Sequence, residues 1–348
     1  MDNLDSYQEP SQESQQPAQA QHYRLAFYGD GMAYFKVWIV NIILTILTLG
    51  IYSAWAKVRN RRYFYGHLEL DNARFEYLAN PITILKGRLI AIGLFIAFNA
   101  LTSLYPQSIF PILALFYLAL PYLVIRSLAF NNSMSSFKNI QFGFDAKYGD
   151  AFVTFILWPL LAIVSLGILA PKAMAEFHRF IVSNSRYGSE SFEFTATWKN
   201  YAPIFLIMIA ISSGGGLLSL LLFIGDANPL ISFAPVVMMA VYFGTYLYFQ
   251  FACLQVFYQS VNLKSFRFKE SFTMMEYTKV SLINALLIFL TLGLYFPAAK
   301  VRMTKFIADN LTVYSWESFD EFTASEVQKQ NALGQETADV FDIEVGAF

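Results

Sequence analysis

Long apolar runs alternate with short polar stretches along most of this chain. Seven of the runs carry almost no charge, and each is close to the roughly 20 residues that an α-helix needs to cross about 30 Å of hydrocarbon. These runs are residues 37–55, 84–104, 109–129, 151–170, 201–224, 230–253 and 280–299. Because they are apolar on all sides, their periodicity does not separate a lipid face from a core face. The pattern predicts an all-α integral membrane protein with about seven hydrophobic helical segments.

One apolar run recurs in the chain. Residues 36–59, KVWIVNIILTILTLGIYSAWAKVR, return as residues 279–302, KVSLINALLIFLTLGLYFPAAKVR, with 13 of 24 positions identical and no gap. In a looser third copy, Ser165, Leu166 and Gly167 stand where the other two copies have Thr-Leu-Gly. Self-similarity at a fixed register is typical of a repeat architecture.

The repeat divides the chain into modules and tails. The predicted membrane modules are residues 23–138, residues 139–262 and a truncated module at residues 263–316. Residues 1–22 are rich in Gln, Ser, Glu and Pro, and they contain too little apolar surface to offset the entropy that is lost on ordering. Residues 317–348 are acidic. We therefore predict a disordered polar tail before the modules and a flexible acidic tail after them.

Short stretches of alternating apolar and polar residues flank the long runs. YRLAFYGDG, from Tyr23, suits one strand that ends in a Gly-Asp-Gly turn. In HLELDNARFEY, the turn residues Asp71 and Asn72 separate two alternating stretches, a pattern that predicts a β-hairpin. The corresponding stretches are FIVSNSRYGSESFEF, with a turn near Asn184, and FIADNLTVYSWESF, from Phe306. We predict a short β-hairpin in a membrane-flanking loop of each module.

Loop charge leaves two topologies open. If all seven runs cross the membrane, successive modules are inverted, and 14 basic residues lie on one side against 10 on the other. If each repeated run instead turns at its Leu-Gly pair and returns, only four runs cross, and all 24 Lys and Arg residues lie on the cytoplasmic side. Glycine tolerates such a turn. The candidate hinge positions are therefore Gly50, Gly167 and Gly293.

Composition supports the membrane class and narrows the chemistry. Apolar residues make up 56% of the chain and charged residues 14%, and the mean hydropathy is +0.44. With Cys253 as the single cysteine, the chain forms no intramolecular disulfide and no thiolate metal site. No metal-ligand spacing, catalytic triad, phosphate loop or nucleic-acid motif appears. We expect no enzymatic activity, no cofactor, no metal and no nucleic-acid partner; the expected partner is the lipid bilayer, and no oligomeric state is predicted.

Two asparagines occupy the same place in the two best copies of the repeat. Asn41 and Asn284 each lie nine residues before the turn glycine, within an apolar run. An amide in hydrocarbon needs a hydrogen-bonding partner. The two asparagines could line a polar path or could pair with each other between modules. Alternatively, each forms a hydrogen bond that packs two helices together.

Gly214, Gly215 and Gly216 lie in the middle of the run at 201–224. Three glycines can unwind a helix and bare its carbonyl oxygens, as in transporter binding sites. The alternative is close packing of the helix against a neighbour.

Four basic residues follow the first repeated run: Lys57, Arg59, Arg61 and Arg62. Such a cluster next to a membrane segment is a candidate contact for anionic lipid head groups. Its alternative role is to hold the loop on the cytoplasmic side.

Several of these motifs resemble one known family. FYG near the start, LTLGIYSAWAKVRNRRYFY, and FEY followed by Lys86 and Gly87 are similar to the YjgN-like family of multi-pass bacterial inner-membrane proteins of unknown function. The resemblance extends from about Tyr23 to about Phe319. It implies a location in the inner membrane and a fold, but no activity and no catalytic or binding residues.

Two functional hypotheses follow. The repeats and the glycine run favour a transporter or channel-like protein with a path between the modules. The lack of carboxylates inside the apolar runs favours a non-catalytic, membrane-embedded protein that interacts with lipids or with other proteins.

Overall fold

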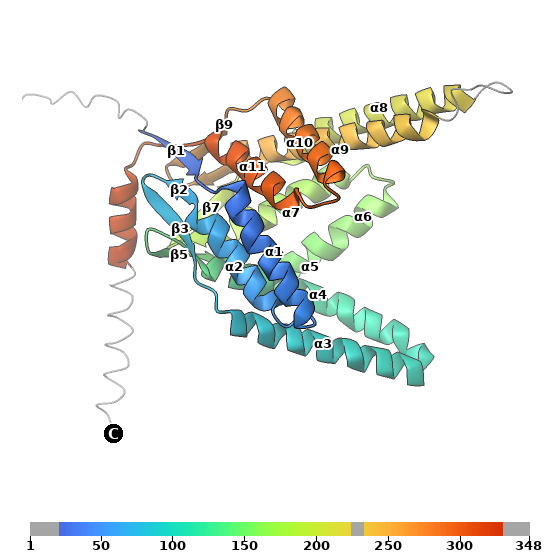
Figure 1. The fold of residues 1–348 in the computed structure, drawn as a ribbon, viewed down its shortest axis with the longest axis horizontal. Helices are drawn as coiled ribbons and strands as arrows, with labels where there is room; N and C mark the ends of the chain where they lie inside the picture. Colours follow the sequence, from blue (N-terminus) through green and yellow to red (C-terminus); the bar gives the residue numbers. More distant parts are fainter. Residues whose placement is uncertain (1–20, 224–232, 330–348) are drawn as a thin grey trace, which may run out of the picture.

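The fold is organised around a closed antiparallel β-barrel of ten short strands, from one end of which the helices extend (Figure 1). The computed structural model describes residues 21–223 and 233–329. The strands are β1 (Gln21–Phe27), β2 (Leu68–Leu70), β3 (Ala73–Tyr77), β4 (Ser135–Phe137), β5 (Ile140–Phe144), β6 (Ser185–Tyr187), β7 (Glu190–Phe194), β8 (Val261–Leu263), β9 (Phe266–Glu270) and β10 (Leu311–Ser315). They follow one another around the barrel in chain order, and β10 closes it against β1. Closure leaves no unpaired edge.

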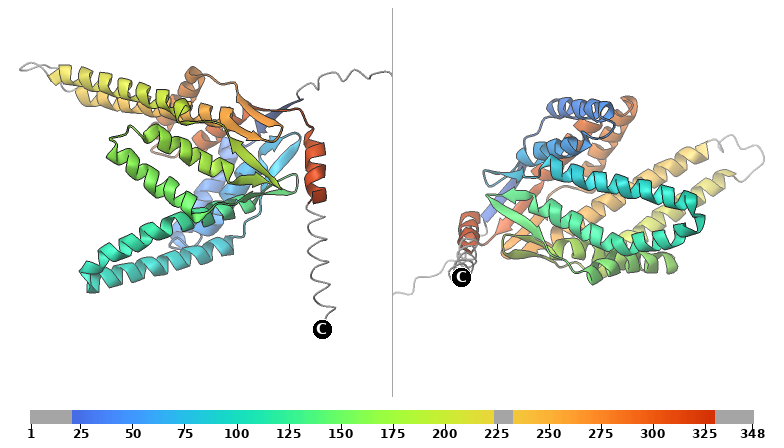
Figure 2. Two further views of the ribbon diagram at one scale, coloured as in Figure 1. Left: turned by 180° about the vertical axis from the view of Figure 1, so that it is seen from behind. Right: turned by 90° about the horizontal axis from the view of Figure 1, so that it is seen from below.

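Helices connect β1 to β2, β3 to β4, β5 to β6, β7 to β8 and β9 to β10, and we call each of these connections a helical excursion. The helices are α1 (Gly31–Leu47), α2 (Ser53–Gly66), α3 (Pro81–Leu104), η1 (Pro106–Ser108), α4 (Ile109–Ser133), α5 (Tyr148–Phe152), the π-helical η2 (Val153–Leu157), α6 (Trp158–Val164), α7 (Ala170–Ser183), α8 (Trp198–Phe223), α9 (Ala234–Ser260), α10 (Met274–Leu290) and α11 (Phe296–Asp309). Because sequential strands are antiparallel, all excursions leave the same end of the barrel, and tight turns close the other end (Figures 1 and 2).

Four helical segments of the described residues are long and apolar enough to cross a membrane. They are Pro81–Leu104, Pro106–Ser133, Trp198–Leu221 and Ala234–Ser260, with mean hydropathies between 1.5 and 2.2. They form two long hairpins that project from the barrel, α3 with α4 and α8 with α9 (Figure 2). The link between α8 and α9 lies outside the described residues.

The prediction of an all-α protein with seven hydrophobic helices is therefore wrong. The other three apolar runs each break into two helices at the Leu-Gly pair. Leu49 has a φ of 50° and Gly50 a φ of 92°, and the same values recur within a few degrees in the other two runs. The hydroxyl of Thr48 then accepts a hydrogen bond from Tyr52 N–H at 2.9 Å, which starts α2. Hydropathy does not register such a turn, because the turn is made by backbone angles within an unbroken apolar sequence.

The β-structure also differs from the predicted separate hairpins. The β2–β3 hairpin and strand β1 lie where the alternation predicts them. In the middle stretch, however, the turn falls at Gly188 and Ser189, while Asn184 ends α7. The last stretch forms the single strand β10. All of these strands join one barrel, because each pairs with a strand that a helical excursion separates from it.

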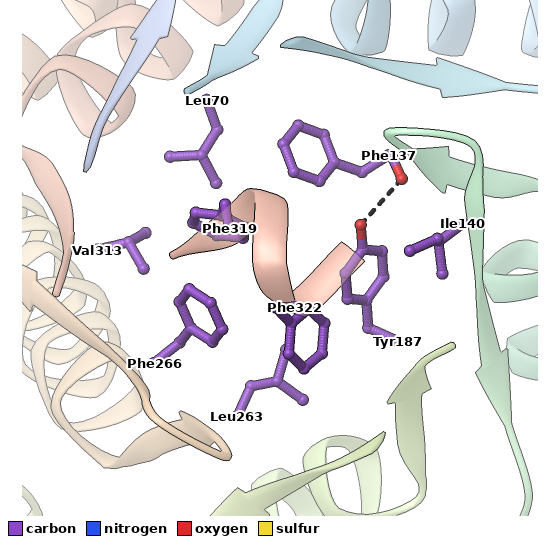
Figure 3. Close-up of a cluster of buried hydrophobic side chains, with 9 residues drawn as sticks. All are labelled: Leu70, Phe137, Ile140, Tyr187, Leu263, Phe266, Val313, Phe319 and Phe322. Atoms are coloured by element: carbon purple, nitrogen blue, oxygen red, sulfur yellow. Dashed lines mark hydrogen bonds between the residues drawn. The ribbon is translucent and has the colours of Figure 1, made fainter. Parts of the chain in front are cut away.

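Side chains fill the interior of the barrel. The buried cluster comprises Leu70, Phe137, Ile140, Tyr187, Leu263, Phe266, Val313, Phe319 and Phe322 (Figure 3). The last two belong to a helix formed by residues 319–329, which we call the C-terminal helix. The part of the predicted flexible acidic tail that the structure describes is therefore folded.

Candidate functional site

The tips of the three short helix pairs are apolar and exposed. Leu49, Leu166 and Leu292 stand at the turns, and each is at least 94% exposed. Their neighbours include Leu47, Ile168 and other exposed aliphatic or aromatic side chains. An exposed apolar patch of this kind is typical of a surface that meets a membrane or a partner.

The candidate hinge glycines lie at these tips. Gly50, Gly167 and Gly293 have φ angles between 89° and 92°. The Gly50 N–H donates to the carbonyl of Thr45 at 2.8 Å, and the equivalent bonds recur at the other two tips. A Cβ atom at any of the three would meet nothing within 4 Å. The backbone angle, rather than a lack of space, therefore requires glycine.

Four basic residues gather between the first tip and the barrel, and we call them the basic cluster: Lys57 and Arg61 on α2, Arg88 on α3 and Lys300 on α11. Arg88 donates a hydrogen bond to the Ser53 hydroxyl, and Lys300 Nζ lies 4.5 Å from the centroid of the Phe64 ring. Among the described residues, no member forms an ion pair with a carboxylate.

The electrostatics of the basic cluster reflect this lack of counter-charge. Burial lowers the pKa of Lys57, and the charges of Arg61 and Arg88 lower it further. Burial and then the charge of Arg61 lower the pKa of Lys300. Proximity to other cations disfavours a protonated amine. An anion bound among these side chains would relieve that repulsion.

The structure divides the four basic residues predicted from the sequence. Lys57 and Arg61 belong to the basic cluster, whereas Arg59 lies exposed on another face of α2. Arg62 turns towards the barrel, where it donates hydrogen bonds to the carbonyl oxygens of Tyr77 and Ala79 at 3.2 and 3.1 Å. Arg88 and Lys300 were not predicted from the sequence. The available signal was only that Arg88 lies within the apolar run at residues 84–104 and that Lys300 directly follows the run at residues 280–299.

The two asparagines pack helices within a pair. Asn41 Nδ2 donates to Asn60 Oδ1 at 2.8 Å, and Asn284 Nδ2 donates to the carbonyl of Ala299 at 3.3 Å. Both side chains are buried, and the Oδ1 atom of each has no hydrogen-bond partner among the described residues. The bonds that they do make join α1 to α2 and α10 to α11.

Helix α8 passes through Gly214, Gly215 and Gly216 without a break. A Cβ atom at Gly215 would lie 2.5 Å from the Cγ atoms of Val241 on α9. The glycine therefore permits close packing of the two long helices. The unwound segment that a transporter site would need does not occur at these three residues.

One histidine, His178, is half-buried where α7 meets α8. His178 Nδ1 lies 2.5 Å from the Tyr201 hydroxyl oxygen, and burial lowers the pKa of His178 to about 4. The imidazole is therefore neutral at physiological pH. No cluster of metal-ligating side chains surrounds it, or lies elsewhere in residues 21–223 and 233–329.

We expect His178 to make stability depend on pH. Its folded pKa of about 4 lies below the usual 6.5. Its contribution is therefore complete above pH 6.5 and is lost as the pH falls towards 4, by about 1.4 kcal/mol per pH unit. Thermal unfolding in detergent at pH 7.5 and 5.5 should show a larger loss for the wild-type chain than for His178→Asn. His22→Asn on the exposed end of β1 serves as the control; equal losses in all three chains would contradict the prediction.

The chain is similar to known bacterial proteins. The family model described as "Bacterial protein of unknown function (DUF898)" matches residues 22–340. Inner membrane protein YjgN of Salmonella typhimurium strain LT2 is 30% identical over 149 residues, which are 42% of this chain and 38% of that protein. Inner membrane protein YjgN of Escherichia coli strain K12 is 31% identical over 143 residues, 40% of this chain and 36% of that protein. No solved structure matches.

The matches span well under half of the length of these relatives. They nevertheless confirm the resemblance based on the Leu-Thr-Leu-Gly motif, and with the long apolar helices they identify a bacterial inner membrane protein. Since the family model covers nearly the whole chain, this protein belongs to the DUF898 family of bacterial proteins of unknown function.

Proposed function

We propose that this chain is a non-catalytic inner-membrane protein that binds anionic lipid head groups at its basic cluster. The observation that carries the proposal is that Lys57, Arg61, Arg88 and Lys300 lie together and that, among the described residues, none of them forms an ion pair with a carboxylate. A phosphate offers several oxygens that accept charge-assisted hydrogen bonds from arginine and lysine. Basic groups at a membrane surface attract anionic lipids by about 1 kcal/mol each.

The depth of the basic cluster supports a lipid head group as the ligand. Arg88 lies seven residues after Pro81, which places it about 10 Å along the candidate span α3. Its contact, Ser53, begins α2 directly after the apolar tip. The cations therefore stand where apolar surface gives way to polar surface, at the level expected for head groups.

The proposed topology puts the barrel on the cytoplasmic side. The two long hairpins cross the membrane, and the three short helix pairs dip their apolar tips into it from the same side. All excursions leave one end of the barrel, which supports this arrangement. All 24 Lys and Arg residues then lie inside. The similar turns at Gly50, Gly167 and Gly293 support the predicted three-module organisation.

We do not propose transport. Side chains fill the barrel interior, and α8 continues through its three glycines. Neither feature supports a solute path in the described part of the chain.

The proposal predicts that removing two charges weakens lipid binding. Lys57→Gln/Lys300→Gln should bind phosphatidylglycerol about thirtyfold more weakly, because two cations contribute about 2 kcal/mol. The measurement is a titration of the detergent-solubilised chain with phosphatidylglycerol, followed by the rise in melting temperature, with phosphatidylcholine as the neutral reference.

The matched control is Arg59→Gln/Arg74→Gln, which removes the same charge from exposed positions outside the basic cluster. It should keep the wild-type preference for phosphatidylglycerol. If both double variants lose affinity equally, net charge rather than the basic cluster determines binding, and the proposed site is wrong.

A further inference from the structure

The end of the barrel opposite the long helices is a ring of tight turns, which we call the barrel mouth. The turns lie at Asp71-Asn72, Lys138-Asn139, Gly188-Ser189 and Lys264-Ser265. The C-terminal helix lies across this mouth, away from the membrane-spanning hairpins (Figures 1 and 2). The C-terminal helix makes its contacts with residues other than those of the basic cluster on α2, α3 and α11.

The barrel is complete without the C-terminal helix. Strand β1 pairs with β10 from Gln21 opposite Ser315 to Arg24 opposite Thr312, and β1 then pairs with β2. Every strand thus has two neighbours before the helix begins. The helix adds side chains to the mouth but no strand to the sheet.

Two phenylalanines, three positions apart, anchor the C-terminal helix. Phe322 is fully buried, with its ring stacked on Tyr187 at 5.9 Å and edge-on to Phe266 at 5.3 Å between centroids. Phe319 lies 4.3 Å from the Phe266 ring (Figure 3). Without these two rings, the mouth would be an apolar hollow lined by aromatic and aliphatic side chains.

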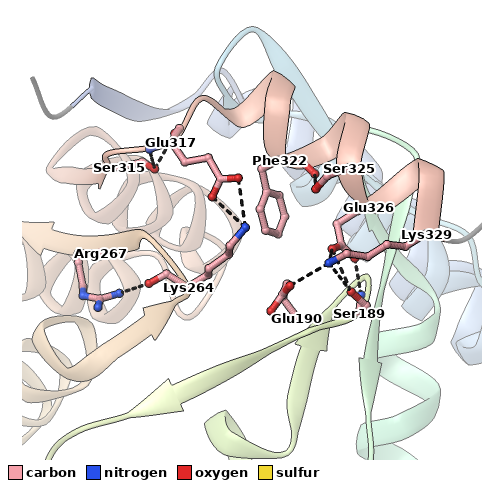
Figure 4. Close-up of polar contacts among 10 residues, drawn as sticks. All are labelled: Ser189, Glu190, Lys264, Arg267, Ser315, Glu317, Phe322, Ser325, Glu326 and Lys329. Carbon is pink, nitrogen blue, oxygen red and sulfur yellow. Dashed lines mark hydrogen bonds and ion pairs between the residues drawn. The ribbon is translucent and has the colours of Figure 1, made fainter. Parts of the chain in front are cut away.

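Two lysines on the rim pair with one acidic residue of the helix and one just before it. Lys138 Nζ lies 2.8 Å from Asp320 Oδ1. Lys264 Nζ lies 3.1 Å from Glu317 Oε2 (Figure 4). The same ammonium groups lie 5.7 and 5.5 Å from the ring centroids of Phe319 and Phe322. Each lysine therefore recognises an acid and an aromatic ring together.

The C-terminal helix also binds the rim through Glu326, which contacts Ser189 in the β6–β7 turn. Glu326 is fully buried, and its carboxylate accepts hydrogen bonds from Ser189 N–H at 2.6 Å and from the Ser189 hydroxyl at 2.9 Å (Figure 4). Lys329 Nζ donates to the same carboxylate at 2.8 Å. A Cβ atom at Gly188 would lie 2.5 Å from Glu326 Oε2, so glycine keeps room for this carboxylate.

From these contacts we infer that the barrel mouth is a binding socket for an acidic amphipathic helix, which the C-terminal helix occupies in cis and which a partner polypeptide with the same pattern competes for. The pattern is two aromatic residues three positions apart with acidic residues before, between and after them. Asp320 is 86% exposed, so its pair with Lys138 is screened by salt and contributes little. Docking in cis is maintained by the effective concentration that the short link 316–318 provides.

The test uses the full chain in detergent and a fluorescent peptide of residues 316–330, WESFDEFTASEVQKQ. The receptor is the Phe319→Ala/Phe322→Ala chain, whose own helix has lost its anchors. We expect this receptor to bind the peptide at least tenfold more tightly than the wild-type chain does. A peptide in which both phenylalanines are alanine should not bind.

Charge reversal tests the register of binding. Adding Lys264→Glu to the receptor places a carboxylate opposite Glu317 of the peptide and should weaken binding at least tenfold. A peptide with Glu317→Lys should restore binding to that receptor. The inference would be overturned if the folded Phe319→Ala/Phe322→Ala receptor did not bind the wild-type peptide. It would also be overturned if that receptor bound the alanine peptide as tightly as the wild-type peptide.

Hydrogen exchange on the wild-type chain covers the case in which the receptor variant does not fold. Residues 319–329 should exchange at least tenfold faster than the barrel strands, and faster still at high salt, because the helix opens while the barrel stays closed. Equal protection of the helix and the strands would show that the helix is a fixed part of the barrel core.

Discussion

Phe266→Ala should lower the free energy of unfolding by about 3–5 kcal/mol, the largest effect of a single substitution that we expect. Phe266 is 1% exposed on β9 and contacts both Phe319 and Phe322 of the C-terminal helix. Because strands surround the site, its walls cannot collapse, and the missing ring leaves a cavity beneath the C-terminal helix. Chemical denaturation of the detergent-solubilised chain measures the change.

Two further variants separate the cavity from other causes. Phe266→Leu retains much of the volume and should cost less than about half as much as alanine. Lys269→Ala removes an exposed side chain from the same strand and should stay within about 0.5 kcal/mol of the wild-type chain. A loss from Lys269→Ala as large as that from Phe266→Ala would mean that β9 is sensitive to any substitution and that the loss does not arise from a cavity at Phe266.

Gly50→Val/Gly293→Val should destabilise the chain by about 2–6 kcal/mol, since each valine at a φ near 90° costs about 1–3 kcal/mol. The two turns lie on different helix pairs, so their costs should add. Thermal unfolding in detergent measures the effect. Asparagine, which enters the left-handed region more readily, should cost less at both positions.

The control for the turns is Gly66→Val/Gly87→Val. Both of these glycines have open space around them and φ angles outside the left-handed region. A β-branched residue there should change stability by less than about 1 kcal/mol. If the control loses as much as the turn variant, the loss arises from the valine side chains rather than from the backbone at the tips.

In the proposed topology, the barrel and the three short helix pairs lie on one side of the membrane. Each excursion begins and ends at the barrel, so the strands set where the helices stand. The apolar tips at Leu49, Leu166 and Leu292 and the long hairpins then share one direction.

The sequence by itself determined the features that act over short distances. Apolar length marked seven runs, which include the four long helices, because a membrane span needs only enough consecutive apolar residues. Alternation with turn residues at Asp71 and Asn72 identified the β2–β3 hairpin. The Leu-Gly pair of each repeated run marked a turn, although its outcome stayed open between two topologies. The three-module organisation stays a prediction.

The tertiary structure alone decided which distant segments meet. Tyr77 pairs with Ser135 across a whole helical hairpin, and Arg88 and Lys300 join one basic cluster from opposite ends of the chain. Acidic composition predicted a flexible tail, yet Phe322 of that tail is buried in the core of the barrel. Local patterns cannot report such pairings, because the free energy that stabilises them arises only after closure of the barrel brings the surfaces together.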